Sequence, residues 1–359
     1  VEGILTRLGF SLEGTEGGWT VHRPAFRHDV TREIDLVEEF IRVYGMDKVE
    51  PELPTFKPFV SPDKAVNFDE LRTGLCAMGY TEVVNYSFIS PRWTRFFGEN
   101  VLELLNPISD EMKIMRNSLI PGLAMTVARN KNLQRRDISI FELGKCFYPR
   151  GKGVLPDEQQ KLGIAISGQS RDTNWSERPR EADFYDIKGA IEALLPGMSV
   201  KPSEHVFYRP GYQADIFLGS SAVGHMGALH EDILSMLDIT DEVYAAEVSV
   251  DAVLGKKWQG MQEIPKFPMT WRDLSLLADA GIPYAEILKV IEGLHIADLR
   301  SVIPVDLYTG EKLPQGKKGI TIRLTYQSGT RTLEDSIIKK WQDKIIQALH
   351  GELGITLRQ

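Results

Sequence analysis

The sequence predicts an α+β protein whose sheets are mainly antiparallel and are flanked by helices. Two observations lead to this class. In the middle of the chain, runs rich in β-branched and aromatic residues follow one another with hairpin-length turns between them, which is typical of antiparallel sheets. Near the end of the chain, segments with strand and helix periodicity alternate in the order βαββαβ, which is typical of a ferredoxin-like domain.

Pro/Gly-rich or polar stretches divide the chain into parts. They lie at residues 50–62, 149–156 and 260–268, and such composition marks loops and linkers. We therefore expect three domains, at residues 1–50, 63–260 and 265–359.

The first unit is predicted to be a small, winged-helix-like α+β module. We expect a helix at 1–8, a polar turn at 13–18, a strand at 19–22 and a helix at 30–44 that Gly45 closes. Because the sequence starts at Val1, inside a predicted helix, we expect that it is a piece of a longer protein.

The middle unit is predicted to combine helices with β-rich runs. The helices are expected at 68–78, 119–132 and 186–195. The strands are expected at 83–89, 137–148, 160–167, 212–218 and 243–250.

The last unit is predicted to have strands at 272–277, 299–307, 319–326 and 355–357, and helices at 284–294 and 333–349. In the third of these strands Thr321, Arg323 and Thr325 alternate with apolar residues, so one face of the sheet should be polar while the other packs on the helices. An open polar face of this kind is where a nucleic acid could bind.

Composition excludes several classes of protein. No run approaches the roughly 18 apolar residues of a membrane helix, so we expect a cytoplasmic protein that does not bind a membrane. Cys76 and Cys146 are far apart, which excludes a CxxC zinc ribbon and does not support a disulfide framework. The net charge of −8 argues against a uniformly basic surface for nucleic acid.

Four carboxylates gather around the second predicted helix: Asp29, Asp35, Glu38 and Glu39. Asp35, Glu38 and Glu39 are spaced i, i+3 and i+4, so they share a helix face, and Asp29 is expected at the start of the helix. Oxygen ligands favour a hard cation such as magnesium. Acidic residues also suit the first turn of any helix, so a solvated face is the alternative interpretation.

Several motifs together resemble the β subunit of bacterial phenylalanyl-tRNA synthetase. They are GYTEVVNYSF (79–88), NPIS (106–109), MRNSLIPG (115–122) and DISIFELG (137–144), followed by the ferredoxin-like domain. The resemblance covers essentially the whole chain and matches the C-terminal portion of that subunit.

This resemblance implies a role for each part. It implies a magnesium ion, shared with the α subunit, at Asp29, Asp35, Glu38 and Glu39. It implies a class II synthetase-like core in the middle and an anticodon-binding domain at the end. The implied partners are the α subunit, in an α2β2 heterotetramer, and tRNA(Phe), with ATP used by the α subunit.

The core is expected to be catalytically silent. Class II synthetases hold ATP with one arginine in motif 2 and another in a Gly-rich motif 3 helix, and losing such a contact costs orders of magnitude in rate. Arg116 is the candidate remnant of motif 2. The Gly-rich segment at 219–230 leads into a helix without an arginine. His225 and His230 do not have the spacing of a helical metal site.

On the last unit, cationic side chains could follow a phosphate backbone, and Tyr308 and Tyr326 could stack on unpaired bases. The cations are Lys312, Lys317, Lys318, Arg323 and Arg331. Soluble lysine-rich loops are the alternative interpretation of these residues.

Three functions remain open. The leading one is a non-catalytic segment that supports ATP-dependent charging of tRNA(Phe) with phenylalanine by the α subunit. A synthetase active by itself would need the missing arginine. A free RNA-binding or regulatory relative of a class II synthetase would need no α subunit.

Overall fold

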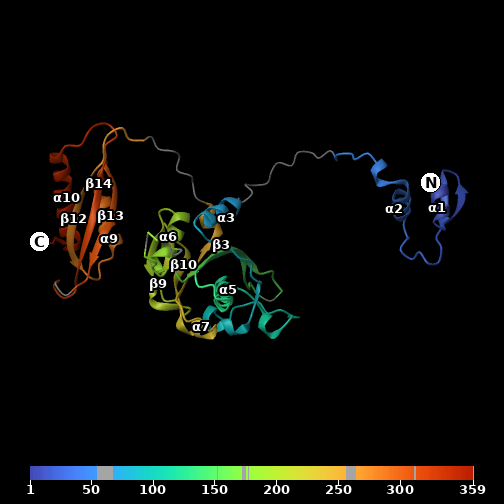
Figure 1. The fold of residues 1–359 in the computed structure, drawn as a ribbon, viewed down its shortest axis with the longest axis horizontal. Helices are drawn as coiled ribbons and strands as arrows, with labels where there is room; N and C mark the ends of the chain where they lie inside the picture. Colours follow the sequence, from blue (N-terminus) through green and yellow to red (C-terminus); the bar gives the residue numbers. More distant parts are fainter. Residues whose placement is uncertain are drawn as a thin grey trace. The chain divides into compact units, whose positions relative to one another are not determined.

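The computed structural model describes residues 1–54, 68–151, 153–171, 175–176, 178–255, 264–310 and 313–358. It divides into two compact units, Val1–Lys256 and Lys257–Gln359, whose elements are labelled in Figure 1.

The first module pairs two helices with one hairpin. Its elements are α1 (Glu2–Arg7), β1 (Ser11–Thr15), β2 (Gly18–His22), α2 (Glu33–Tyr44) and a short 3₁₀ turn at Met46–Lys48. β1 and β2 are antiparallel, with Ser11 opposite His22. Leu5, Phe10 and Val30 form its small buried core, against which Leu36 of α2 packs. The helix that the sequence predicted at residues 30–44 begins at Glu33 in the structure.

The middle of the chain builds a seven-stranded sheet in the order β3-β6-β7-β11-β10-β9-β8. The long central strands β6 (Ile138–Tyr148) and β7 (Asp157–Ser167) pair over their whole length. The other strands are β3 (Thr81–Glu82), β8 (Ser199–Pro202), β9 (Tyr208–Leu218), β10 (Ser221–Leu229) and β11 (Val243–Ser249). Each neighbouring pair is antiparallel except β3 with β6, which is parallel.

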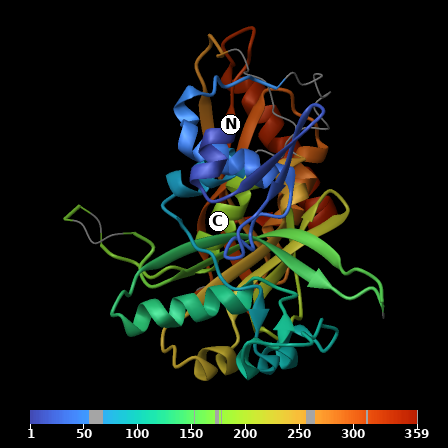
Figure 2. The same ribbon diagram turned by 90° about the vertical axis from the view of Figure 1, so that its right-hand side faces the viewer.

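Apolar helices pack on both faces of this sheet. On one face α5 (Ile120–Asn132) buries Leu123 and Val127 together with Trp93, and Figure 2 shows α5 lying along the β6–β7 hairpin. On the other face Leu75 and Ile191 belong to a second buried cluster. The helices that contribute to these layers are α3 (Phe68–Ala77), α4 (Thr94–Phe97), α6 (Phe184–Leu194), α7 (Glu231–Met236) and α8 (Val250–Leu254).

The strand predicted at 83–89 is wrong as a continuous element. Its first part continues from β3, where the Val83 amide donates to the Phe141 carbonyl. Its end, β4 (Phe88–Ile89), pairs with β5 (Ile114–Met115) in a separate two-stranded sheet. Asn85 lies between the two and donates its side-chain amide to Glu142 at 2.7 Å. The chain therefore passes from one sheet to the other, with short 3₁₀ turns at Pro91–Trp93 and Asp110–Met112 following.

The last unit has the predicted ferredoxin-like order. Its elements are β12 (Thr270–Asp279), α9 (Tyr284–Gly293), β13 (Leu299–Tyr308), β14 (Lys317–Tyr326), α10 (Asp335–Leu353) and β15 (Thr356–Leu357). The antiparallel sheet runs β13-β14-β12-β15. Ile320, Ile322 and Leu324 are buried with residues of α9 and α10, so the alternation along β14 is as predicted. The α+β class, the antiparallel core and the ferredoxin-like domain are confirmed.

Within the described ranges, no helix combines the length and the apolar character needed to span a bilayer.

Candidate functional site

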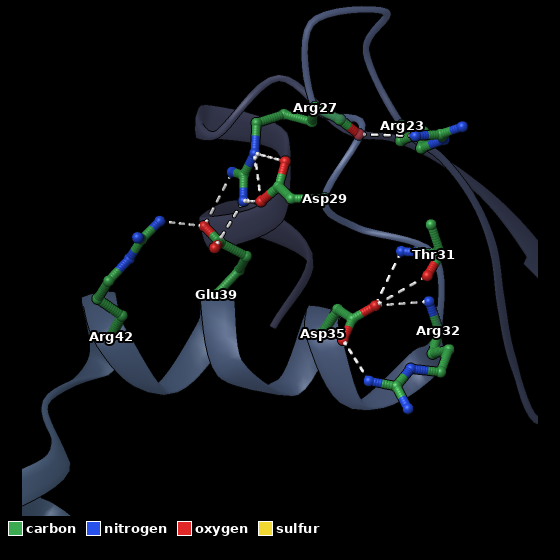
Figure 3. A network of polar contacts seen from close by, with 8 residues as sticks. All are labelled: Arg23, Arg27, Asp29, Thr31, Arg32, Asp35, Glu39 and Arg42. Atoms are coloured by element: carbon green, nitrogen blue, oxygen red, sulfur yellow. Dashed lines mark hydrogen bonds and ion pairs between the residues drawn. The ribbon is translucent and has the colours of Figure 1, made fainter. Parts of the chain in front are cut away.

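The acidic segment of the first module lies partly on a loop and partly on α2 (Figure 3). Asp29 belongs to the loop before the helix, Asp35 to its first turn and Glu39 to the next turn. Glu38 is exposed, whereas Glu39 is buried. Asp29 is therefore not at the helix start, where the sequence predicted it.

An arginine lies between two of these carboxylates. The Arg27 Nε is 3.0 Å from Asp29 Oδ1, and its Nη2 is 2.6 Å from Asp29 Oδ2. The same guanidinium reaches Glu39, with Nη1 at 3.0 Å from Oε2 and Nη2 at 2.7 Å from Oε1. Arg42, one turn along α2, pairs with Glu39 as well. Arg27 thus joins the loop to the helix by two bidentate contacts.

Asp35 has a different role. Its Oδ2 accepts hydrogen bonds from the backbone amides of Thr31 and Arg32, both at 2.8 Å. The first amides of a helix have no intrahelical acceptor, so this carboxylate satisfies donors at the start of α2. These hydrogen bonds also hold the pKa of Asp35 below its ordinary value. Asp35 therefore acts as a helix cap.

The charges of this cluster are balanced within the module. Hydrogen bonding to Arg27 lowers the pKa of Asp29 to about 2 and lowers the pKa of Glu39 as well. The same contacts raise the pKa of Arg27. All three groups are therefore charged at neutral pH, and the guanidinium is the counter-ion of both carboxylates.

The predicted magnesium site does not fit this arrangement. Oxygen ligands of a divalent cation must converge on one point, but Asp29 and Glu39 converge on Arg27, Asp35 caps the helix and Glu38 faces solvent. Across the residues that the structure describes, no group of three or more His, Cys, Asp or Glu side chains is arranged to hold a metal. The spacing along the helix was correct, but Arg27 was overlooked as a competing cation.

The candidate phosphate ligand Arg116 is a buried structural residue. It follows β5, and its Nη1 is 2.5 Å from Glu142 Oε1 while its Nε is 3.0 Å from the Lys145 carbonyl. Gly144 makes room for it, because a Cβ there would lie 2.2 Å from Arg116 Nη2. The interpretation of Arg116 as a remnant of a phosphate site is therefore not supported by its position.

A further buried carboxylate, Glu247, lies on β11 and was not predicted from the sequence. Glu247 Oε2 accepts from Ser118 Oγ at 2.8 Å and from the Leu119 amide at 2.6 Å, at the start of α5. Burial raises its pKa. The only signal in the sequence is a glutamate within the apolar run of residues 243–250.

The two histidines considered in the sequence have structural contacts. His225 Nδ1 lies 3.1 Å from the Tyr208 hydroxyl, and burial lowers the pKa of His225 to about 3. The ring of His230 accepts from the Asp232 amide at the start of α7. The His225 ring is therefore neutral near pH 7.

The open face of the terminal sheet is polar but largely charge-neutral. Arg323 makes two hydrogen bonds of 2.8 Å to Asp273 on the neighbouring strand. Lys317 pairs with Asp279 at 2.8 Å, and Lys318 donates to the carbonyls of residues 280 and 282. Arg331 is exposed and makes no ion pair with any described residue. Lys312 lies outside the described residues.

The two tyrosines predicted to stack on bases lie in different environments. Tyr326 is fully buried and stacks on Trp341 in the core, so the prediction that it contacts bases is wrong. Tyr308 is half-buried, and the Arg358 guanidinium lies 4.9 Å from its ring centre. Trp271 on β12 is 54% exposed. Arg358 and Trp271 were missed because only the pairing of the strands brings them onto this face.

Three family models match consecutive parts of the chain. The model described as phenylalanyl tRNA synthetase beta chain CLM domain matches residues 50–250, more than half of the chain. The chain belongs to the phenylalanyl-tRNA synthetase β-chain family. The tRNA synthetase B5 domain model matches residues 1–46, and the ferredoxin-fold anticodon binding domain model matches residues 265–358.

Curated relatives of this β-chain family are named phenylalanine–tRNA ligase beta subunit. The relative from Syntrophus aciditrophicus is 31% identical over 99% of this chain and 47% of its own length. Those from Geobacter sulfurreducens and Shewanella oneidensis are each 33% identical, over 93% and 99% of this chain and 44% and 46% of their own lengths. The chain spans about half the length of the curated relatives it matches.

Among solved structures, a pyrrolysyl tRNA synthetase from Desulfitobacterium hafniense is similar with a TM-score of 0.40 and 17% identity, over 54% of this chain and 68% of that one.

In this member of the β-chain family, the acidic cluster lies in the part matched by the B5 model. The polar sheet face lies in the part matched by the anticodon-binding model.

Proposed function

We propose that this chain is a non-catalytic β-subunit segment of phenylalanine–tRNA ligase. In this proposal it assembles with an α subunit into an α2β2 complex in the cytoplasm and binds tRNA(Phe). The α subunit uses ATP and Mg²⁺ to charge that tRNA with phenylalanine. The observation that supports this best is the open polar face of the terminal sheet in a domain matched by the anticodon-binding model.

Two features of the core support a scaffold rather than an active site. α5 and α6 belong to buried clusters on the two faces of the sheet, so the central strands β7 and β11 are covered on both sides. Catalysis of adenylate formation depends on preorganised cations that meet the phosphates, and the candidate Arg116 is engaged with Glu142.

For tRNA binding we propose an aromatic platform on the terminal sheet. Tyr308 with Arg358, and Trp271 beside Arg323, expose rings on the open face of a sheet. Such rings can stack on unpaired anticodon bases without requiring net charge. Arg331 is the candidate for a phosphate contact, whereas Lys317, Lys318 and Arg323 are already engaged within the domain.

For the α subunit we propose a contact at exposed apolar side chains of the core and not at its aromatic cluster of Trp93, Phe96 and Phe97. Trp93 and Phe96 are buried, and Phe97 packs against the same cluster. Other apolar side chains on the neighbouring segments are instead strongly exposed, and large exposed apolar groups are typical of protein interfaces. They are Val84, Tyr86, Leu105 and Ile108.

Co-expression with an α subunit tests the proposal. We expect the two chains to purify together in equal numbers, and we expect the complex to bind tRNA(Phe). Tyr86→Asp and Leu105→Glu should weaken assembly, whereas Leu155→Glu, a matched change of an exposed leucine on the β6–β7 connection, should not. Equal assembly of all three variants would refute the proposed contact.

A free RNA-binding or regulatory relative is the alternative function. It would bind RNA without co-purifying with an α subunit. Phenylalanine-dependent pyrophosphate exchange by the isolated chain would instead identify an independent enzyme and would overturn the scaffold proposal.

A further inference from the structure

At the predicted metal site, the carboxylates of Asp29 and Glu39 bind an arginine of the same module, Arg27. Asp29 and Glu39 come from different segments, and each presents both of its oxygens to one guanidinium. Arg42 adds a second cation to Glu39. The two oxygen pairs that a divalent ion would need are therefore occupied by nitrogen donors.

The guanidinium is also fixed in place by its surroundings. The Arg27 side chain is only 17% exposed, and Glu39 is 6% exposed. The Arg27 guanidinium carbon lies 5.8 Å from the centre of the buried Phe10 ring, which belongs to the module core. The Arg27 carbonyl accepts from Arg23 at 2.9 Å, which fixes the loop. Since Arg carries a planar fork of donors, it matches two carboxylates in a way that lysine cannot.

We infer that Arg27 is the cation of this site, so that the loop before α2 is joined to the helix by a guanidinium clamp rather than by a divalent ion. Three residues form the clamp: Arg27, Asp29 and Glu39. Its function is structural. It links the loop at residues 23–29 to α2 and to the core under Phe10, and this link does not depend on magnesium. The inference is independent of the proposed role in tRNA charging.

Variants of the other two carboxylates, Glu38 and Asp35, distinguish a clamp from a metal site. Glu38 is exposed, and its side chain makes no hydrogen bond or ion pair with any described residue, so Glu38→Gln should leave a clamp unchanged. Asp35→Asn keeps an oxygen acceptor for the Thr31 and Arg32 amides and removes only the charge. Both changes would remove ligands from a magnesium site.

The test is amide hydrogen exchange of the full 359-residue chain, alone and in complex with the α subunit that would share a magnesium ion, read by mass spectrometry on peptides that cover α2. Wild-type protein is compared in MgCl₂ and in EDTA at equal ionic strength. The clamp predicts identical exchange in both solutions. Faster exchange in EDTA than in MgCl₂ would show that a divalent ion holds this segment and would overturn the inference.

Hydrogen exchange in α2 of Arg27 and Glu38 variants is the second part of the test. Arg27→Gln should speed exchange in α2 by about tenfold, because charged hydrogen bonds to two carboxylates are lost. Arg27→Lys, which keeps one charge, should give a smaller increase, and Glu38→Gln should exchange like wild type. If Arg27→Gln exchanged like wild type, or if Glu38→Gln matched Arg27→Gln, the clamp would be refuted. The comparison in MgCl₂ and EDTA uses wild-type protein and is therefore decisive even if Arg27→Gln unfolds the module.

Discussion

Arg116 and Glu142 form an ion pair inside the core, with 2.5 Å between Nη1 and Oε1 and side chains only 5% and 2% exposed. Glu142 also accepts from Asn85, and Arg116 also donates to the Lys145 carbonyl. These contacts connect the segment at Asn85 with β6 and with the residue that follows β5.

Removing one partner of this pair should destabilise the core strongly. Arg116→Met leaves Glu142 buried without its counter-ion, and breaking a buried pair in this way typically costs about 3–5 kcal/mol. We expect the urea midpoint of the core transition, followed by circular dichroism, to fall accordingly. The double variant Arg116→Met, Glu142→Leu should recover much of the loss. If Arg116 were instead a phosphate ligand, the single variant would unfold like wild type.

The packing of α5 on β7 depends on Gly163. A Cβ at this position would lie 2.7 Å from Leu123 Cδ1 and 3.0 Å from Leu119 Cβ. Gly163→Ala should therefore lower the free energy of unfolding by about 1–3 kcal/mol, as overpacked cores do. Gly189→Ala is the matched control, because no atom lies within 4 Å of the new Cβ on the exposed side of α6. It should raise stability by up to about 1 kcal/mol. Equal effects in thermal unfolding would contradict the packing argument.

The neutral, buried His225 should make the core sensitive to acid. Its pKa is about 3 in the folded protein against an ordinary 6.5, so the unfolded chain binds a proton that the folded chain excludes. The contribution of neutral His225 to the free energy of unfolding is fully present above pH 6.5. It is lost as the pH falls from 6.5 toward 3, at up to about 1.4 kcal/mol per pH unit.

The buried Glu247 acts in the opposite direction, because its raised pKa favours the protonated form in the folded state. The comparison with a His225→Gln variant isolates the histidine. Between pH 6.5 and pH 4 the variant should lose less stability than wild type in parallel urea titrations. Parallel curves for the two proteins would show that His225 does not contribute to the acid sensitivity.

On the terminal sheet, the contribution of ring stacking to tRNA binding should differ from that of charge in its dependence on salt. Tyr308→Leu should weaken binding of tRNA(Phe) to the assembled complex by about 1–3 kcal/mol without changing the salt dependence, because a ring stacks on a base without releasing counter-ions. Arg331→Gln should reduce the slope of log K against log salt by about one. Filter binding over a salt series distinguishes them, and a changed slope for Tyr308→Leu would contradict its proposed role.

Much of the fold follows from local patterns. The alternation along Ile320, Thr321, Ile322 and Arg323 predicted which face of β14 is buried, because successive side chains in a strand point to opposite faces. The predicted helices of the core and the predicted strands that correspond to β6, β7, β9 and β11 lie within a few residues of the observed bounds, whereas β10 (Ser221–Leu229) was not predicted. The segment at 83–89 is rich in β-branched and aromatic residues, but the Asn85 side chain donates to Glu142 and the chain changes sheets there.

The sites depended on contacts that no local pattern contains. The sequence by itself determined the fold class, the family resemblance and the acidic character of α2, because these are properties of periodicity, motif order and spacing. Only the tertiary structure decided that Arg27 lies between Asp29 and Glu39, that Arg116 is buried against Glu142 and that Tyr326 is in the core while Tyr308 is near Arg358. The physical reason is that a charged or aromatic side chain is assigned its role by the partners that folding brings to it from other segments.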